Sequence, residues 1–197
     1  MRSPSRSRLA PAVGASASRY QLKLTLRDTE PTIWRRIEVP GTTFLGQLHN
    51  VIQKVMGWRN AHLHEFVAQG VRYGVPDPDE PHYKVEPDWR VQLRTIAPAA
   101  GLSFEYVYDL GDNWIHDVLV EQIDTPAKPL RYPICLGGER SCPPEDCGGV
   151  GGYERMLDVL ADPDDPEHDD MRRWVGRRFD PQAFDLAAVN RKLRLLK

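Results

Sequence analysis

Three cysteines in the C-terminal half are the residues whose type and spacing most directly suggest chemistry. Cys135, Cys142 and Cys147 follow a C-x6-C-x4-C pattern, and thiolates are common ligands of zinc. The pattern lacks the CxxC spacing of a zinc knuckle. A fourth ligand would have to come from another part of the chain: His116, His168 or a carboxylate such as Asp146. One hypothesis is therefore a zinc site formed by the three cysteines and His116.

The segment "CPPEDCGG", residues 142–149, also fits a purely structural role. Its two prolines fix φ, and Glu145 and Asp146 would complement the dipole of a short helical turn. The cysteines would then be small buried hydrophobic side chains. A nucleophilic cysteine is disfavoured, because neighbouring carboxylates raise the pKa of a thiol. Both the zinc site and the rigid turn remain open.

The stretch "DLGDNWIH" offers a histidine and two aspartates as a weak catalytic set. On a strand, His116 shares a face with Trp114. His116 could act as a general base oriented by Asp109 or Asp112, or as a metal ligand. The alternative is a buried histidine that bonds a backbone carbonyl, with both aspartates accepting hydrogen bonds from turn amides.

The stretch "HLHEF" contains two further histidines. His62 and His64 would point to the same side of a strand, about 7 Å apart. Such a pair can chelate one ion, and His116 on another strand could complete the ligand set. A metal-dependent hydrolase using His62, His64, His116 and Asp109 is therefore an alternative function. Paired histidines on a strand are also common without a metal.

Clusters of arginine beside aromatic residues are the last candidates. This combination can contact phosphates and stack on bases. The alternative is a solvated surface that the nearby acidic residues 162–170 partly neutralise. The candidate nucleic-acid contacts are Arg35, Arg36, Arg172, Arg173, Arg177 and Arg178.

Bulk composition limits the classes of function. The chain has 197 residues, 41% hydrophobic residues and a net charge of −2. This balance gives no overall attraction to nucleic acid or to anionic membranes. No segment approaches the ~20 apolar residues of a membrane span. Three cysteines, an odd number, favour a reducing compartment, and we expect a cytoplasmic protein. Residues 1–18 are expected to form a disordered tail before a single domain over 19–197.

Hydrophobic periodicity predicts the elements that must position these residues. Alternation is typical of strands, and the i, i+3, i+4 spacing is typical of helices. The expected strands are 20–27, 33–39, a pair within 62–75 that turns at Gly70, 102–108 and 114–123. The expected helices are 44–57, 153–162, one within 162–179, and 180–196 with Asp180 as its cap. This order predicts an α+β fold: a mixed or antiparallel sheet with one helix packed on it and a C-terminal helical tail. The ββαβ start resembles a β-grasp.

Four segments together carry a resemblance to a known family. They occur in this order: "YQLKLTLRDTEPTIWRRIEVP", "YVYDLGDNWIHDVLVE", "CLGGERSCPPEDCGGVGGYERML" and "FDPQAFDLAAVN". The chain resembles the plasmid pRiA-type ORF-3-like family from about Tyr20 to Leu196. The resemblance implies a fold and an association with plasmids and insertion elements. It implies no particular reaction.

The function expected from the sequence is a non-enzymatic binding module with a protein or nucleic-acid partner. The chain supplies many turn and packing signals and no complete catalytic motif. The alternatives are the metal-dependent hydrolase and a structural zinc protein with cysteine ligands. Zinc is the one cofactor that the sequence suggests.

Overall fold

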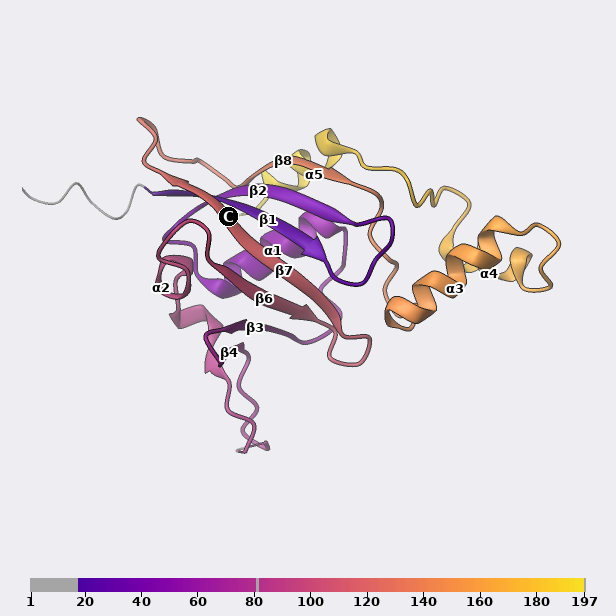
Figure 1. Ribbon diagram of the computed structural model, residues 1–197, viewed down its shortest axis with the longest axis horizontal. Coiled ribbons are helices and arrows are strands. Elements are labelled where there is room, and N and C mark those ends of the chain that lie inside the picture. The colour runs from indigo at the N-terminus through magenta and orange to yellow at the C-terminus, as the bar shows by residue number, and fades with distance from the viewer. Residues whose placement is uncertain (1–17, 81, 197) are drawn as a thin grey trace, which may run out of the picture.

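The computed structural model describes residues 18–80 and 82–196, which form a mixed sheet with helices on one face and at one side (Figure 1). The sheet has eight strands in the order β5-β4-β3-β6-β7-β1-β2-β8. All pairs are antiparallel except β4 and β5. The strands are β1 Arg19–Leu26, β2 Trp34–Pro40, β3 His64–Ala68, β4 Val71–Gly74, β5 Glu86–Pro87, β6 Ser103–Tyr108, β7 Trp114–Asp124 and β8 Ile134–Glu139.

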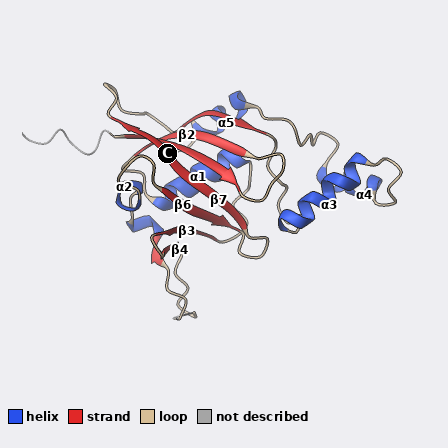
Figure 2. Ribbon diagram, in the orientation of Figure 1, coloured by secondary structure: helices blue, strands red, loops and turns tan. Residues whose placement is uncertain are grey.

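The helices confirm the α+β class and the helical C-terminal part (Figure 2). They are α1 Leu45–Met56, α2 Leu93–Ile96, α3 Gly149–Ala161, α4 His168–Val175 and α5 Leu186–Leu193, with a 3₁₀ turn at Asp88–Arg90. The expected tail, residues 1–18, lies outside the described residues except for Ser18. The Ser18 carbonyl accepts a hydrogen bond from Gly41 N.

The core forms between α1 and one face of the sheet. On β1, alternation buries every second side chain from Tyr20 to Leu26. The α1 helix buries its apolar stripe, which includes Leu45, Leu48 and Ile52. Fully burying one such leucine contributes roughly 1.5–3 kcal/mol. The helix ends where expected, because Gly57 adopts φ 104°, in the left-handed region that favours glycine.

The opposite face of the sheet is polar and carries ion pairs between strands. Arg27, just after β1, bonds Glu105 and Asp117, and Arg36 on β2 bonds both carboxylate oxygens of Glu121. The strand pleat therefore sends Arg36 to this open face and its neighbour Arg35 to the interior.

Several elements differ from the sequence-based expectation. β5 and the short α2 lie where no element is expected, and α3 starts at Gly149 rather than at Tyr153. β8 is not expected from the sequence, because its LGG segment lacks a clear alternation. The last helix starts at Leu186 rather than after Asp180. Asp185 caps it by accepting a hydrogen bond from Ala188 N, whereas Asp180 bonds Gln182 N outside any helix. The chain order ββαβ is correct, but β6 and β7 separate β3 from β1.

The α3 and α4 helices extend away from the edge of the sheet, and the segment after α4 returns the chain to α5 beside β8 (Figure 1). The end of α4 and the segment 183–192 line a cavity together with the end of α1. Within residues 18–80 and 82–196, no helix has the length and apolar content needed to cross a bilayer.

Candidate metal centre and adjoining cavity

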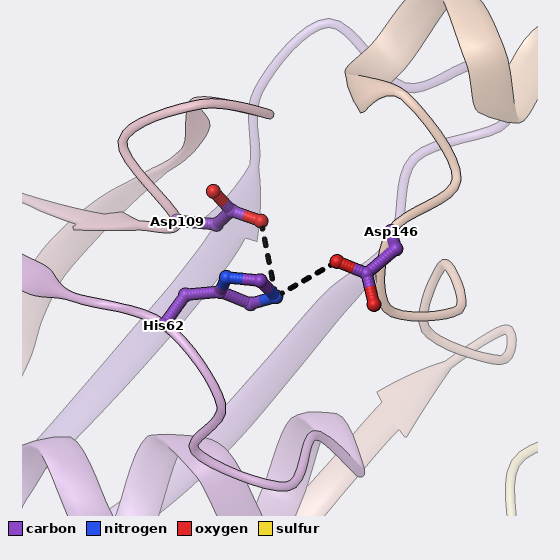
Figure 3. A group of neighbouring side chains, drawn as sticks. All are labelled: His62, Asp109 and Asp146. Carbon is purple, nitrogen blue, oxygen red and sulfur yellow. Dashed lines mark ion pairs between the residues drawn. The ribbon is translucent and has the colours of Figure 1, made fainter.

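Three side chains from distant parts of the chain converge at one end of the sheet (Figure 3). His62 Nε2 lies 3.0 Å from Asp146 Oδ1 and 3.4 Å from Asp109 Oδ2. Glu145 Oε2 lies 3.7 Å from the same nitrogen. One ligand atom from each of His62, Asp109 and Asp146 lies within 4.8 Å of the other two. Among the described residues, this is the one group of three or more histidine, cysteine or acidic side chains that meets this limit. We call these three residues the metal-ligand group.

Each member of the group lies in a connection rather than in a regular element. His62 lies between α1 and β3, Asp109 follows β6, and Asp146 lies in the turn before α3. Both aspartates have left-handed backbones, with φ 57° at Asp109 and φ 60° at Asp146. Such non-glycine conformations cost of order 1–3 kcal/mol and concentrate at functional sites.

Protein donors hold two of the carboxylates in place. Asp109 Oδ1 accepts hydrogen bonds from Gly111 N and Asp112 N, which leaves Oδ2 facing His62. Glu145 accepts from Arg59 N at 2.7 Å and from the Tyr108 hydroxyl at 3.0 Å. Burial raises the pKa of Tyr108 to about 12, so its hydroxyl remains a donor at neutral pH.

The contacts around His62 differ from ordinary hydrogen bonds. Its Nε2 atom is buried and makes no hydrogen bond within the described residues, although an Asp146 oxygen lies 3.0 Å away. Two or three carboxylates around one imidazole also repel one another. The arrangement thus places carboxylate oxygens close to one imidazole nitrogen, in contacts with the distances of ion pairs.

The turn over residues 142–149 is docked firmly on the sheet body. Trp58 Nε1 donates to Pro143 O, and Gly148 N donates to Asp112 Oδ2. Gly149 has φ 67°, and a Cβ there would lie 2.6 Å from the Asp112 carbonyl oxygen. Only glycine fits this close approach, which brings Asp146 to His62.

A cavity of about 580 Å³ adjoins the metal-ligand group. Its walls come from the end of α1, the 141–146 turn, the end of α4 and the segment 183–192. Ala61, Glu145 and Asp146 line it, whereas His62 and Asp109 do not. The group and the cavity therefore share Asp146.

The thiols do not form the expected zinc site. No three of Cys135, Cys142, Cys147 and His116 have ligand atoms within 4.8 Å of one another. Cys135 is buried on β8, and its backbone bonds the side chain of Asn190 on α5. Burial raises the pKa of all three thiols, to about 12 for Cys147. His168 instead bonds the Val159 carbonyl in α3.

His116 occupies the core rather than a catalytic site. It is fully buried, and its Nδ1 lies 3.2 Å from Trp114 O and 3.3 Å from Tyr106 O. It has no bond to Asp109 or Asp112. Burial lowers the pKa of His116 to about 4, which keeps the ring neutral.

His64 does not point toward the same site as His62, although the strand pattern predicts that it would. His62 precedes β3, so the two-residue alternation does not extend to it. His64 Nε2 bonds Asp88 Oδ2 at 2.9 Å, and its ring stacks on His49 at 3.5 Å between centroids. Burial lowers the pKa of His49 to about 4. These rings belong to a polar network inside the fold.

The six candidate arginines are scattered. Arg35 is 2% exposed and Arg36 is bound to Glu121, so neither is available to a nucleic acid. On α4, Arg173 pairs with Asp170. Arg172 donates to the Phe179 carbonyl. The remaining two, Arg177 and Arg178, are exposed.

Sequence reasoning identifies His62 and Asp109 but assigns them to other partners, and it considers Asp146 only as a ligand beside the cysteines. It misses Glu145 as a neighbour of the group and Tyr108 as the donor that holds Glu145. The sequence does contain a signal for this group: Glu145 and Asp146 are adjacent acids in a turn between two prolines and two glycines. Compensation of a helix dipole accounts for only part of their negative charge.

Comparisons with known proteins agree with this fold. The family model described as "Plasmid pRiA4b ORF-3-like protein" matches residues 18–188. The uncharacterized protein y4hQ of Sinorhizobium fredii (strain NBRC 101917 / NGR234) is 36% identical over 176 residues, which cover 89% of this chain and 90% of that protein. The crystal structure of MM3350, a protein of unknown function from Methanosarcina mazei Go1, is similar with a TM-score of 0.77 and 37% identity, over 86% of this chain and 96% of that one. The chain therefore belongs to the plasmid pRiA4b ORF-3-like protein family.

Proposed function

We propose that the protein binds a divalent metal ion through His62, Asp109 and Asp146 and uses it to hydrolyse a substrate held in the adjoining cavity. The observation that carries this proposal is the convergence of the three side chains from three separate connections (Figure 3).

The spacing of the ligand atoms supports a shared ion. Ligands about 2.1 Å from a tetrahedral ion lie about 3.4 Å apart. The distances from His62 Nε2 to the oxygens of Asp146 and Asp109 are 3.0 and 3.4 Å. A divalent ion would also offset the repulsion among the carboxylates. One imidazole with carboxylates suits zinc or manganese.

The number and exposure of the ligands favour a catalytic over a structural ion. Structural zinc sites are closed by four protein ligands, whereas catalytic sites keep a position for water or substrate. The side chain of Asp146 is 70% exposed, so solvent reaches the group from this side. The cavity has the volume of a small-molecule site.

A bound ion would lower the pKa of a water molecule at an open coordination position. Glu145 lies beside the group and is held by Arg59 N and the Tyr108 hydroxyl. Its carboxylate would accept the proton of the attacking water, and Asp109 and Asp146 would fix the position of the ion.

Metal titration of metal-stripped protein by calorimetry tests the proposal. We expect one ion per chain, and an affinity at least about 100-fold lower in Asp109→Asn and Asp146→Asn, because each loses a ligand. Tyr108→Phe should leave the affinity within about twofold, since the Tyr108 hydroxyl orients Glu145, which is not a ligand in this proposal. The matched control is Asp158→Asn, which changes an aspartate on α3 outside the metal-ligand group. Unchanged affinity in both ligand variants would rule the proposal out.

A second candidate function is nucleic-acid binding by the end of α4. Trp174 is 52% exposed there, close in sequence to the exposed Arg177 and Arg178. Aromatic and arginine side chains together can stack on bases and contact phosphates. The test is a gel shift of labelled single-stranded DNA at low salt: binding that weakens with salt and in Trp174→Ala supports this candidate, and no binding removes it.

A further inference from the structure

The wall of the cavity carries more basic than acidic side chains. Four basic and three acidic side chains line it. Asp146 belongs to the metal-ligand group, and Glu145 lies beside it and accepts hydrogen bonds from Arg59 N and the Tyr108 hydroxyl. The third, Asp185, caps α5 by accepting a hydrogen bond from Ala188 N. The acids therefore have other partners, and the charges that remain available to a ligand are basic. These residues are Arg35, Lys54, Arg59 and Lys192.

The four basic side chains share the wall with three carboxylates but make no direct ion pair with them among the described residues. In the described part of the chain, none of the four forms an ion pair with a carboxylate. They come from distant elements: Arg35 from β2, Lys54 from α1, Arg59 from the loop after α1, and Lys192 from α5. The fold thus gathers four cations on one concave surface.

The surroundings of Arg35 give the strongest indication that the cavity binds an anion. It is 2% exposed, and it donates to the backbone carbonyls of Val55, Trp34, Glu139 and Arg140. A guanidinium has five N–H groups, so one on Nη2 has no acceptor within the described residues. A buried cation is costly unless a counter-charge compensates it. Burial lowers the pKa of Arg35, as expected for a cation without a carboxylate partner.

Aromatic groups complete the wall. The Phe184 ring lies 4.4 Å from Arg35 Cζ, and Trp174 lines the cavity from α4. An anion bound near Arg35 would therefore lie beside rings that can contact an apolar or aromatic group. Arginine and lysine clusters of this kind bind phosphate groups.

We propose that the cavity binds a phosphate monoester with an aromatic or heterocyclic group, its phosphate lying among Arg35, Lys54, Arg59 and Lys192. Binding stands on the cavity alone; the reaction rests on the metal site proposed above. Water attacks phosphorus, the ester P–O bond breaks, and the leaving oxygen takes a proton. The products are an alcohol or phenol and inorganic phosphate.

Binding is tested with metal-free protein and phenyl phosphate as the probe, by calorimetry at low ionic strength. Lys54→Ala and Lys192→Ala should each weaken binding about tenfold, since each removes a charged contact to phosphate. The matched control is Lys84→Ala, which lies in the exposed loop before β5 and should bind as the wild type does. Arg35→Lys could fail to fold, so the lysine variants carry the test.

Phenyl phosphate should bind more tightly than benzoate, because phosphate carries more charge and more acceptor oxygens. No binding at millimolar concentration, equal binding of benzoate, or an unchanged affinity in the Lys54→Ala/Lys192→Ala double variant would overturn the inference. Metal binding is measured separately. Loss of anion binding with intact metal binding therefore rejects only this inference, and the reverse result rejects only the metal site.

Discussion

His62 and His116 illustrate two uses of the same side chain in one molecule. His116 lies within β7, fully buried, and contacts only backbone carbonyls and aromatic rings. His62 lies in a loop, partly exposed, and faces carboxylates from two other loops. Burial makes His116 part of the core, whereas convergence with acids is the basis of the chemical role proposed for His62.

Replacing each histidine with alanine should give the largest effects, on stability for His116 and on metal affinity for His62. His116→Ala should lower the free energy of unfolding by about 3–4 kcal/mol, because it leaves a cavity in a packed aromatic cluster. His62→Ala should change stability by less than about 1 kcal/mol but lower metal affinity at least about 100-fold. Urea unfolding and metal titration measure the two quantities. His82→Ala, at an exposed histidine, is the control.

The comparison fails if the two variants lose stability and metal affinity in the same proportion. It also fails if folded His116→Ala loses metal binding while His62→Ala retains it.

Acid pH should act on the buried histidines. The pKa of His116, and that of His49, is lowered from 6.5 to about 4 in the folded protein. Between pH 6.5 and 4, each of these histidines is protonated in the unfolded chain but neutral in the folded chain. The free energy of unfolding therefore falls as the pH falls from 6.5 to 4. The expected loss by pH 4.5 is about 2–3 kcal/mol for each histidine. Urea unfolding at pH 7 and 4.5 measures it.

A His116→Leu variant sharpens this test, because it removes one titrating group from the core. Its stability should decline less on acidification than that of the wild type, by about 2–3 kcal/mol. An identical decline in both proteins would show that His116 does not resist protonation.

Glycine substitutions test whether the 142–149 turn delivers Asp146 to His62. Gly149→Ala should cost about 1–3 kcal/mol and weaken metal binding, because a Cβ would contact the Asp112 carbonyl at 2.6 Å and φ is 67°. Gly151→Ala is the matched control, since a Cβ added there would have no atom within 4 Å. Thermal unfolding and metal titration of both variants give the answer; equal behaviour would contradict the role of the turn.

The smallest effect is expected at the thiols. Replacing Cys142 and Cys147 with alanine should leave metal stoichiometry unchanged and affinity within about twofold, because neither thiol belongs to the metal-ligand group. Elemental analysis of the purified double variant measures this. A loss of bound metal would support a metal site formed by the cysteines and contradict the proposed ligand set.

Local patterns in the sequence predict much of the fold. The alternation from Tyr20 to Leu26 and the apolar stripe that ends at Gly57 each specify an element within a few neighbouring residues. Asp180 and Asp185 are equally good helix caps by type, and the difference arises from contacts outside the segment: Ser141 Oγ donates to the Asp180 carbonyl. Local pattern alone could not choose between them.

The candidate site was predictable only in its parts. Residues 62, 109 and 146 each stand out in the sequence, but they lie in three loops, and loop sequences do not reveal which loops meet. The same limit applies to Arg35 and Arg36. The strand pattern predicts that they face opposite sides, but only tertiary packing decides that Arg35 faces the cavity.

The position of a bound ion tests the central claim most directly. Crystals grown with manganese or zinc would show the ion by anomalous scattering. We predict one peak about 2.0–2.2 Å from His62 Nε2 and from oxygens of Asp109 and Asp146. A peak at the thiols, or no peak near His62 at saturating metal, would contradict the claim.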